Sequence, residues 1–247
     1  MNMLTNYLTL NILILLFPLL FSFKWVFPYY KNYKPLAASI LIVGGTYILW
    51  DLIVTMRGDW WFAEEYLIGI EFIIPLEEAL FFVVVPYSCI FIYENLQYFF
   101  PDKEVKFNKW IYYVIAILLA IVAIIFYHQE YTILALLSVT TFLLIAATWF
   151  PDLLQSRNYW AYIGLSFVAF LIFNYLLTSI PIVLYNSDAI WGGTYNEAVR
   201  QLWNGRFITI PFEDFFYNFS MLSFYLLVYR YFKKRWITPS KKTTRKT

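Results

Sequence analysis

I-P-L-E-E at residues 74–78 recurs 136 positions later as I-P-F-E-D at residues 210–214. Each copy opens a stretch that is otherwise apolar enough to lie in lipid. An ionised side chain at membrane depth costs roughly 3 kcal/mol or more, and such side chains usually face an internal cavity where they carry out chemistry or move charge. The two carboxylate pairs therefore predict a functional surface that is duplicated within one chain.

Composition predicts an integral membrane protein. Hydrophobic residues make up 62% of the 247 residues and aromatic residues 23%, whereas charged residues make up only 14%. This is too little charge to solvate the surface of a soluble domain of this length. The net charge of +2 is close to neutral, and we expect no nucleic-acid partner. His128 is the only histidine and Cys89 the only cysteine, which disfavours zinc and haem, so we expect neither a metal nor another cofactor.

Seven apolar runs are long enough to cross a bilayer, which takes about 20 residues of helix. Backbone groups in lipid must pair within their own segment, and the alternation typical of a barrel strand is absent, so each run predicts a helix. The predicted fold class is an all-α membrane protein with seven transmembrane helices. The runs cover residues 4–23, 36–55, 72–93, 110–127, 132–150, 160–185 and 207–229.

Basic residues are divided unevenly between the two ends of these helices. Most of the lysines and arginines lie in the segments 24–35, 94–109 and 151–159 and in the C-terminal tail. Because cytoplasmic loops carry the excess of Lys and Arg, we expect a multi-pass protein of the cell membrane with its N-terminus outside and its C-terminus in the cytoplasm. The opposite side carries only Arg57, Arg200 and Arg206.

With this topology the two acidic helices, the third and the seventh, run in the same direction through the membrane. Helices one to three and five to seven then form two parallel three-helix repeats, related by a pseudo-two-fold axis along the membrane normal and joined by one linker helix. Gly69 with Gly205 and Tyr93 with Tyr229 match at the same offset. The predicted division is residues 1–109 for the first repeat, 110–130 for the linker helix, 131–236 for the second repeat and 237–247 for a basic cytoplasmic tail.

The candidate catalytic residues are the four acids Glu77, Glu78, Glu213 and Asp214. We expect them about one and a half to two turns inside the outer end of their helices, without a basic partner in the spans. Burial disfavours the charged form of a carboxyl group, and so does a second carboxyl nearby, so we expect these groups to hold protons and to act as general acids. Neighbouring residues on a helix point about 100° apart, so one of each pair can face a bound molecule while the other orients it. Three further polar residues are predicted to support them: Asp51, Glu71 and Asn174.

Pro75 and Pro211 precede the acids, and two interpretations of them are open. Proline lacks a backbone donor and is tolerated early in a helix. It would equally loosen the local hydrogen-bond ladder and present a carbonyl group to a cavity. The sequence does not decide between these interpretations.

Aromatic side chains surround the acids in the sequence. Such rings can line a cavity for a polyene and can stabilise a carbocation by cation-π attraction, at roughly 0.5 to 2 kcal/mol for a well-placed ring. Acids beside aromatic walls suit electrophilic chemistry on an alkene, although aromatic residues also simply fill space and mark the membrane interface. The candidate substrate-binding aromatic residues are Trp50, Phe81, Phe82, Phe215, Phe216 and Tyr217.

These features together resemble a known family. The run P-L-E-E-A-L-F-F at residues 75–82, its partner P-F-E-D-F-F at residues 211–216, Trp-Asp at residues 50–51 and the three-helix repeats are similar to the integral-membrane, cofactor-independent lycopene β-cyclases. That family occurs as two small subunits or as one fused chain, and this sequence resembles the fused form over nearly its whole length. The duplicated P-x-E-[ED] in membrane helices is a fairly specific motif, and both acidic pairs named above match it position by position.

The resemblance implies cyclisation of the ψ ends of lycopene to β-ionone rings, through γ-carotene to β-carotene. A carboxylic acid would protonate the terminal double bond, the neighbouring alkene would attack the cation, and a carboxylate would remove a ring proton, with no net redox change. It also implies lycopene or another carotenoid as substrate, membrane lipid around the protein, and other enzymes of carotenoid biosynthesis as partners. Two departures, Asp214 in place of a glutamate and a longer loop over residues 186–206, leave open whether both halves contribute equally and whether one or both ends of lycopene close.

Other functional classes compete with this one. A proton-coupled transporter or a carotenoid carrier would use parallel repeats and intramembrane carboxylates in the same way, and only conversion of a polyene without a gradient would separate it from an enzyme. A retinal-binding protein would need a Schiff-base lysine in its last span, and residues 207–229 contain none. A membrane prenyltransferase would need paired D-x-x-x-D motifs, and the sequence has none.

Overall fold

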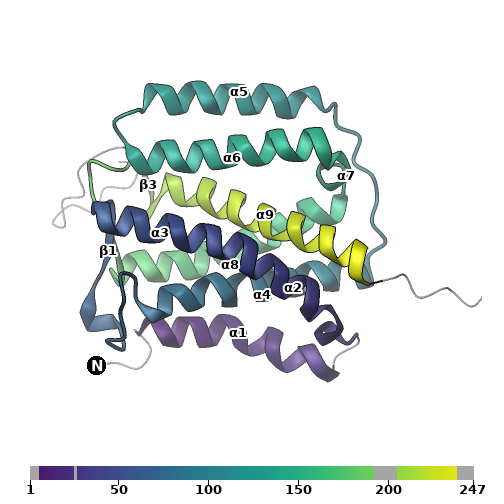
Figure 1. The fold of residues 1–247 in the computed structure, drawn as a ribbon, viewed down its shortest axis with the longest axis horizontal. Coiled ribbons are helices and arrows are strands. Elements are labelled where there is room, and N and C mark those ends of the chain that lie inside the picture. Colours follow the sequence, from purple (N-terminus) through teal and green to yellow (C-terminus); the bar gives the residue numbers. More distant parts are fainter. Residues whose placement is uncertain (1–5, 25–26, 192–204, 238–247) are drawn as a thin grey trace, which may run out of the picture.

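The computed structural model describes residues 6–24, 27–191 and 205–237, in which the apolar runs form long helices that lie side by side (Figure 1). The predicted basic tail lies outside these residues except for Ile237, and so does most of the predicted long loop over residues 186–206. The helices of the bundle are α1 (Tyr7–Lys24), α2 (Tyr33–Ser39), α3 (Gly45–Arg57), α4 (Leu76–Phe99), α5 (Trp110–Ile125), α6 (Glu130–Trp149), α8 (Arg157–Ser179) and α9 (Phe212–Trp236). The shorter elements are the helical turns Tyr29–Asn32, Ile40–Gly44 and Glu64–Tyr66, the helix α7 (Pro151–Leu154), and the strands β1 (Trp60–Phe62), β2 (Val183–Tyr185), β3 (Arg206–Phe207) and β4 (Ile210–Pro211).

The length and composition of these helices are those of a membrane protein. Four helical segments are long and apolar enough to cross a bilayer: Tyr29–Arg57, Leu76–Phe99, Glu130–Trp149 and Arg157–Ser179. Two further helices are apolar but shorter. On α5, side chains such as Ile117, Leu118 and Ile124 are 56 to 72% exposed. A continuous exposed apolar face of this kind is stable against lipid and unfavourable in water.

Most helix ends differ from the sequence prediction by a few residues, and three of the differences lie at the end of the bundle that carries the acids. The helix α4 begins at Leu76 rather than at residue 72, and α9 begins at Phe212 rather than at residue 207. In both helices a proline occupies the N-cap position with an extended backbone, so of the two interpretations given above the structure supports proline as a residue tolerated at a helix start. The helix α8 ends at Ser179 rather than at residue 185, because the last predicted residues form β2.

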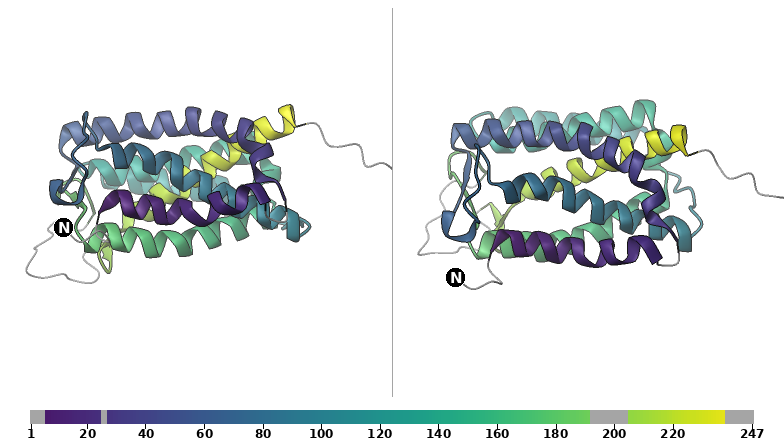
Figure 2. Two further views of the ribbon diagram at one scale, coloured as in Figure 1. Left: turned by 90° about the horizontal axis from the view of Figure 1, so that it is seen from below. Right: turned by 60° about the horizontal axis from the view of Figure 1, so that its bottom comes forward.

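The packing pairs helices that are far apart in the sequence. α1 packs against α4, and α6 packs in the same way against α9. α2 contacts α9, while α8 contacts α4, so helices of each half of the chain lie against helices of the other. α5 covers the outer side of α6 (Figure 1). The central pair, α4 and α9, carries the two acidic stretches and is surrounded by the other helices (Figure 2).

Short strands close the end of the bundle at which α4 and α9 begin (Figure 1). β1 and β2 pair in antiparallel fashion, with Trp60 opposite Tyr185. A tight turn precedes each acidic helix, and in each turn a glycine has a positive φ, 80° at Gly69 and 72° at Gly205. Glycine adopts this left-handed backbone without steric cost, which explains why these two positions match between the halves.

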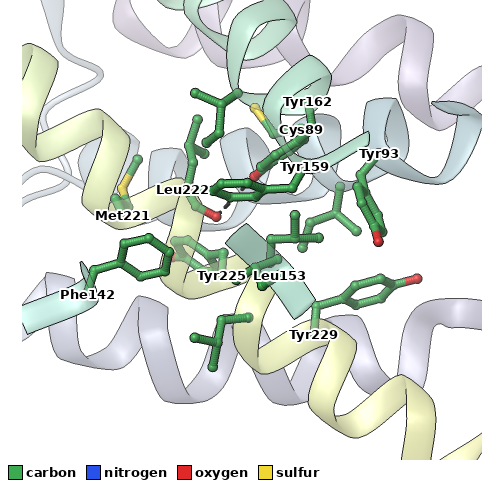
Figure 3. Close-up of a cluster of buried hydrophobic side chains, with 14 of the residues drawn as sticks. Cys89, Tyr93, Phe142, Leu153, Tyr159, Tyr162, Met221, Leu222, Tyr225 and Tyr229 are labelled. Atoms are coloured by element: carbon green, nitrogen blue, oxygen red, sulfur yellow. Dashed lines mark hydrogen bonds between the residues drawn. The ribbon is translucent and has the colours of Figure 1, made fainter. Parts of the chain in front are cut away.

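Tyrosine side chains dominate the core between α4, α8 and α9 (Figure 3). Tyr159, Tyr162 and Tyr225 are fully buried. The Tyr162 hydroxyl donates to the carbonyl oxygen of Leu222 at 3.1 Å, and the Tyr225 hydroxyl donates to that of Phe82 at 2.7 Å. Buried phenols are stable when their hydroxyl groups find such partners. This core fixes α4 against α9 and hence the relative positions of the two acidic stretches.

Candidate active site

The four predicted catalytic acids lie in the first turns of α4 and α9. This is nearer the helix ends than the one and a half to two turns expected from the sequence, because both helices begin later than predicted. All four side chains are buried: Glu77, Glu78, Glu213 and Asp214 are at most 9% exposed. Backbone N–H groups of a first helical turn favour a negatively charged side chain nearby.

Within each pair the two acids have different surroundings. Glu77 Oε1 accepts a hydrogen bond from the backbone N–H of Ile68 at 2.7 Å. Glu213 Oε1 accepts one from the backbone N–H of Trp191 at 2.6 Å, and another from the hydroxyl of Thr132. Both glutamates therefore bind the loops next to their helices. Neither is among the residues that line the cavity described below.

Glu78 faces the interior and is held by the first half of the chain. The Tyr7 hydroxyl donates to Glu78 Oε2 at 2.6 Å. Asp51 is close enough to Glu78 for an electrostatic interaction, and its own Oδ1 accepts a hydrogen bond from the indole N–H of Trp60 at 2.8 Å. The first half thus presents two neighbouring carboxyl groups, of which Glu78 receives a single hydrogen bond from the described residues.

Asp214 faces the same interior and is held by three donors of the second half. The Tyr131 hydroxyl donates to Oδ1 at 2.6 Å, and the Asn174 side-chain amide and the Tyr185 hydroxyl donate to Oδ2 at 2.8 and 2.9 Å. Burial raises the pKa of the Tyr185 hydroxyl well above its ordinary value, and the neighbouring Asp214 raises it further. Tyr185 therefore keeps its proton and acts as a donor. The guanidinium group of Arg206 lies over the Tyr185 ring, 5.5 Å from its centroid.

Glu78 and Asp214 line one cavity of about 500 Å³. Its walls come from α1, α4, α8 and α9, with β1 and β2 closing the acidic end. Most of the lining side chains are apolar, and Phe81, Phe170 and Tyr217 are among the aromatic ones. Cavities of this size, with apolar walls and a few convergent polar groups, are typical binding sites for small organic molecules.

The other predicted polar residues have different positions. Asn174 lines the cavity and binds Asp214, as described above. Asp51 is buried beside Glu78 but is not among the lining residues. Glu71 lies in the loop before α4, where it is exposed and pairs through its backbone with Pro75. The structure therefore brings Asn174 and Asp51 to the acids and leaves Glu71 outside.

The predicted aromatic residues are divided in a similar way. Phe81 and Tyr217 line the cavity. Phe82 is buried in the core, and Trp50 packs on Tyr217 with a centroid distance of 5.1 Å. The remaining two do not line the cavity but pack around it: Phe215 against Phe170 of α8, and Phe216 against the buried core.

Sequence reasoning missed several residues that contact the acids, namely Tyr7, Tyr131 and Tyr185. A signal for the first two exists, because each stands at the beginning of an apolar run and the two runs are the first helix of each predicted repeat. Their offset of 124 differs from the 136 of the acidic stretches, so a search at a single offset does not find them. Comparing the repeats helix by helix would have done so.

A metal site is not formed by the part of the chain that the structure describes. Within residues 6–24, 27–191 and 205–237, no group of three or more His, Cys, Asp or Glu side chains lies close enough together to hold a metal ion. The side chains that line the cavity supply two carboxyl groups, phenols, two amides, two serine hydroxyl groups, one thiol and aromatic rings.

Comparison with known proteins identifies the family. The chain matches the family model described as lycopene cyclase over residues 5–96 and 128–232, well over half of its length. The segment between the two matched parts contains α5. A search of curated proteins found no match, and a search of solved structures found none either. The chain belongs to the lycopene cyclase family and is an enzyme of carotenoid biosynthesis.

Proposed function

We propose that this lycopene cyclase closes the ψ ends of lycopene to β-ionone rings, giving γ-carotene and then β-carotene, with Glu78 and Asp214 as its catalytic residues. The observation that carries the proposal is that these two buried carboxyl groups, one from each acidic stretch, line the same apolar cavity. The family match favours this activity over the transporter and the carotenoid carrier considered above.

The cavity suits a polyene that becomes a carbocation. Its walls are mostly apolar, and rings such as Phe81 and Tyr217 line it together with the acids. An aromatic face attracts a cation by roughly 0.5 to 2 kcal/mol. Exclusion of water protects the cation from being trapped as an alcohol, and an apolar slot within a membrane bundle provides that exclusion.

The hydrogen bonds suggest different roles for the two acids. Donors to a carboxylate favour its ionised form, and Asp214 has three of them, whereas Glu78 has one and a second carboxyl group, Asp51, beside it. Glu78 then gives a proton to the terminal double bond, and the adjacent alkene attacks the tertiary cation to form the ring bond. Asp214 takes a proton from a ring carbon, which leaves the ring double bond. One proton is added and one removed, so no redox partner is needed.

Glu77 and Glu213 have a supporting role in this proposal. Each accepts hydrogen bonds from a backbone N–H of a loop at the acidic end of the bundle. An amide oxygen can accept the same bonds, so their amide variants should be affected less than those of the two cavity acids. Glu71, which is exposed in a loop, has no role in the reaction as proposed.

A duplicated architecture accounts for the matched contacts of the two halves. Seven membrane crossings would form two parallel three-helix repeats, residues 1–109 and 131–236, with a linker at 110–130. The tyrosine of the first helix binds the acid of the third helix at 2.6 Å in both halves. Tyr7 also stacks on Phe62 and Tyr131 on Tyr185, with centroid distances of 6.5 and 6.0 Å. The distribution of Lys and Arg supports an outer N-terminus and a cytoplasmic C-terminus in the cell membrane.

Expression in a lycopene-accumulating bacterium tests this proposal by chromatography of the pigments. We expect wild type to form β rings, Glu78→Gln and Asp214→Asn to lose about 100-fold or more in turnover, and Glu77→Gln and Glu213→Gln to lose clearly less. Glu65→Gln, at an exposed glutamate of the same end, is the matched control. Unchanged lycopene with wild type would refute the cyclisation. Full turnover in both cavity amides would refute the assignment of the acids.

A further inference from the structure

We infer that the chain has one reaction centre, built jointly by its two halves, and that the two ends of lycopene are closed in successive visits to the same slot. The half-cyclised polyene must then leave the slot and enter again with its other end first. This inference rests on the proposed function and adds to it the number of centres and the order of the reaction.

The cavity is a slot with one acidic end. Along α4 it is lined from Glu78 to Ile92, a rise of about 21 Å at 1.5 Å per residue. Among the described residues that line it, Glu78 and Asp214 are the only acidic ones, and both lie in the first turns of their helices. The other end is lined by uncharged residues such as Phe17 and Ile92. A polyene that lies along the slot therefore meets carboxyl groups at one of its ends only.

A duplicated fold with two centres would need a second slot between α3 and α6, which correspond to α8 and α1 in the proposed duplication. Side chains fill the space between α3 and α6. Tyr47, Trp50 and Tyr217 pack together with ring centroids 5.1 to 5.5 Å apart. The hydroxyl groups of Tyr47 and Ser220 lie 2.9 Å apart, and Ser138 donates to Ser220 at 2.7 Å. This chain of hydroxyl groups links α3, α9 and α6 where a second slot would have to open.

The supporting polar groups of both halves also meet at the one acidic end. Asp51 interacts electrostatically with Glu78, and Glu78 with Asp214. Asn174 binds Asp214 from the other side. The slot is lined by α1 and α4 of the first half and by α8 and α9 of the second half. The duplication has thus produced one composite centre.

The chemistry of each ring closure then uses both acids. One carboxyl group supplies the proton that is added to the terminal double bond, and the other accepts the proton that leaves the ring carbon. Each closure leaves Glu78 ionised and Asp214 protonated, and return of this proton from Asp214 to Glu78 prepares the centre for the next closure, so the isomerisation needs no co-reactant. Loss of either acid should therefore stop the first and the second closure alike.

Single variants decide between one centre and two. Glu78→Gln and Asp214→Asn are each supplied with lycopene and, separately, with γ-carotene, and protein levels are compared with those of Glu65→Gln. One centre predicts that the first closure, measured with lycopene, and the second closure, measured with γ-carotene, fall by the same factor of about 100-fold or more in each variant. A variant that lost one closure and kept the other would mean independent centres and would overturn the inference. Unchanged turnover of both substrates would instead refute the proposed function as well.

An isotope experiment tests the release of the intermediate. Purified wild-type protein in lipid vesicles is given lycopene together with an excess of isotope-labelled γ-carotene. Release predicts that β-carotene carries the label from the first turnovers, in proportion to the labelled share of the γ-carotene pool. Unlabelled β-carotene formed at early times, in spite of the labelled pool, would overturn the inference while leaving the cyclase activity intact.

A steric block tests the position of the slot. Ala169 of α8 lines the cavity, so Ala169→Phe should fill the slot and lower both closures by about tenfold or more. Thr46 of α3 stands at the corresponding position, at the same offset that relates Asn174 to Asp51, and is exposed. Thr46→Phe should keep the turnover of wild type. If Thr46→Phe selectively stopped one of the two closures, a second slot would exist and the single centre would be wrong.

Discussion

Glu78 in the first half and Asp214 in the second occupy the same position in the first turn of their helices, but their hydrogen-bond partners and neighbouring polar groups differ. Each follows a proline N-cap by three residues, and each accepts a hydrogen bond of 2.6 Å from a tyrosine at the beginning of a neighbouring helix. Around Glu78 the remaining neighbour is a carboxyl group, whereas around Asp214 it is an amide and a second phenol. The helix positions and the tyrosine contacts of the two acids match, and their remaining polar neighbours differ.

In the proposed reaction, two similar carboxyl groups carry out opposite proton transfers, and their different surroundings account for this. A donor-rich environment favours the ionised form of a carboxyl group, and a neighbouring carboxyl group disfavours it. Two pairs of corresponding residues differ between the halves: Asp51 and Asn174, and Phe62 and Tyr185. Exchanging the residues of each pair therefore tests whether these surroundings set the roles of the two acids. We order the tests by the size of the effect that we expect.

The largest effect should come from Asn174→Asp. This change replaces the donor that lies 2.8 Å from Asp214 Oδ2 by an acceptor, and it places two carboxyl groups in contact inside the bundle. A buried polar group that loses its partner costs about 1 to 3 kcal/mol, so turnover should fall by about 10 to 100-fold. The measurement is kcat for lycopene in vesicles, with protein level as a check on folding.

The reciprocal change, Asp51→Asn, is the matched control. Asp51 Oδ1 accepts the hydrogen bond of the Trp60 indole, and an amide oxygen can accept the same bond. Burial still disfavours the ionised form of Glu78 when Asp51 is replaced, so we expect a loss of no more than about threefold. If both changes lowered kcat equally, the two environments would be equivalent and the division of roles between the acids would be wrong.

The sequence predicted the helices and the acidic pairs well because their signals are local. Hydropathy places each apolar run in a helix, and the repeated stretch marks the two acidic helices without reference to the rest of the chain. The starts of α4 and α9 were predicted too early because the residues before Pro75 and Pro211 are also apolar. Hydropathy cannot tell an apolar loop at the end of a bundle from the first turn of a helix.

The rest of the site depends on contacts between distant residues. Tyr7 and Glu78 are 71 positions apart, and Tyr131 and Asp214 are 83 apart. Which acid of each pair faces the cavity depends on the rotation of its helix, and that rotation is set by packing against other helices. The pairing of β1 with β2 involves strands of three residues, which are too short for a period-two pattern to predict.

Removal of the tyrosine hydroxyl groups should have a smaller effect, and it should differ between the halves. Tyr7 provides the one hydrogen bond that Glu78 receives from the described residues, whereas Tyr131 is one of three donors to Asp214. Tyr7 orients the Glu78 carboxyl group, and a hydrogen bond of this kind is worth about 1 to 2 kcal/mol, so loss of this orientation in Tyr7→Phe should lower kcat by about tenfold. Tyr131→Phe should lower it by about threefold. Both tyrosines act through an acid, so KM should remain near its wild-type value, and a change in KM alone would indicate a purely structural role.

The smallest effects should come from exchanging the aromatic residues of the two strands. Tyr185→Phe removes one of the three donors to Asp214 and keeps the ring that stacks on Tyr131, so kcat should fall about two- to threefold. Phe62→Tyr places a phenol at the corresponding position, where the ring stacks on Tyr7 beside Glu78, and an added donor would favour the ionised form of Glu78 and so lower the fraction of the protein in which Glu78 carries a proton. We expect kcat to fall by a similar factor, although a hydroxyl group has been added rather than removed. In the proposed reaction Glu78 gives a proton and Asp214 accepts one, so a nearby hydroxyl group should hinder Glu78 and help Asp214. An increase of kcat in Phe62→Tyr would show that Glu78, like Asp214, works in its ionised form.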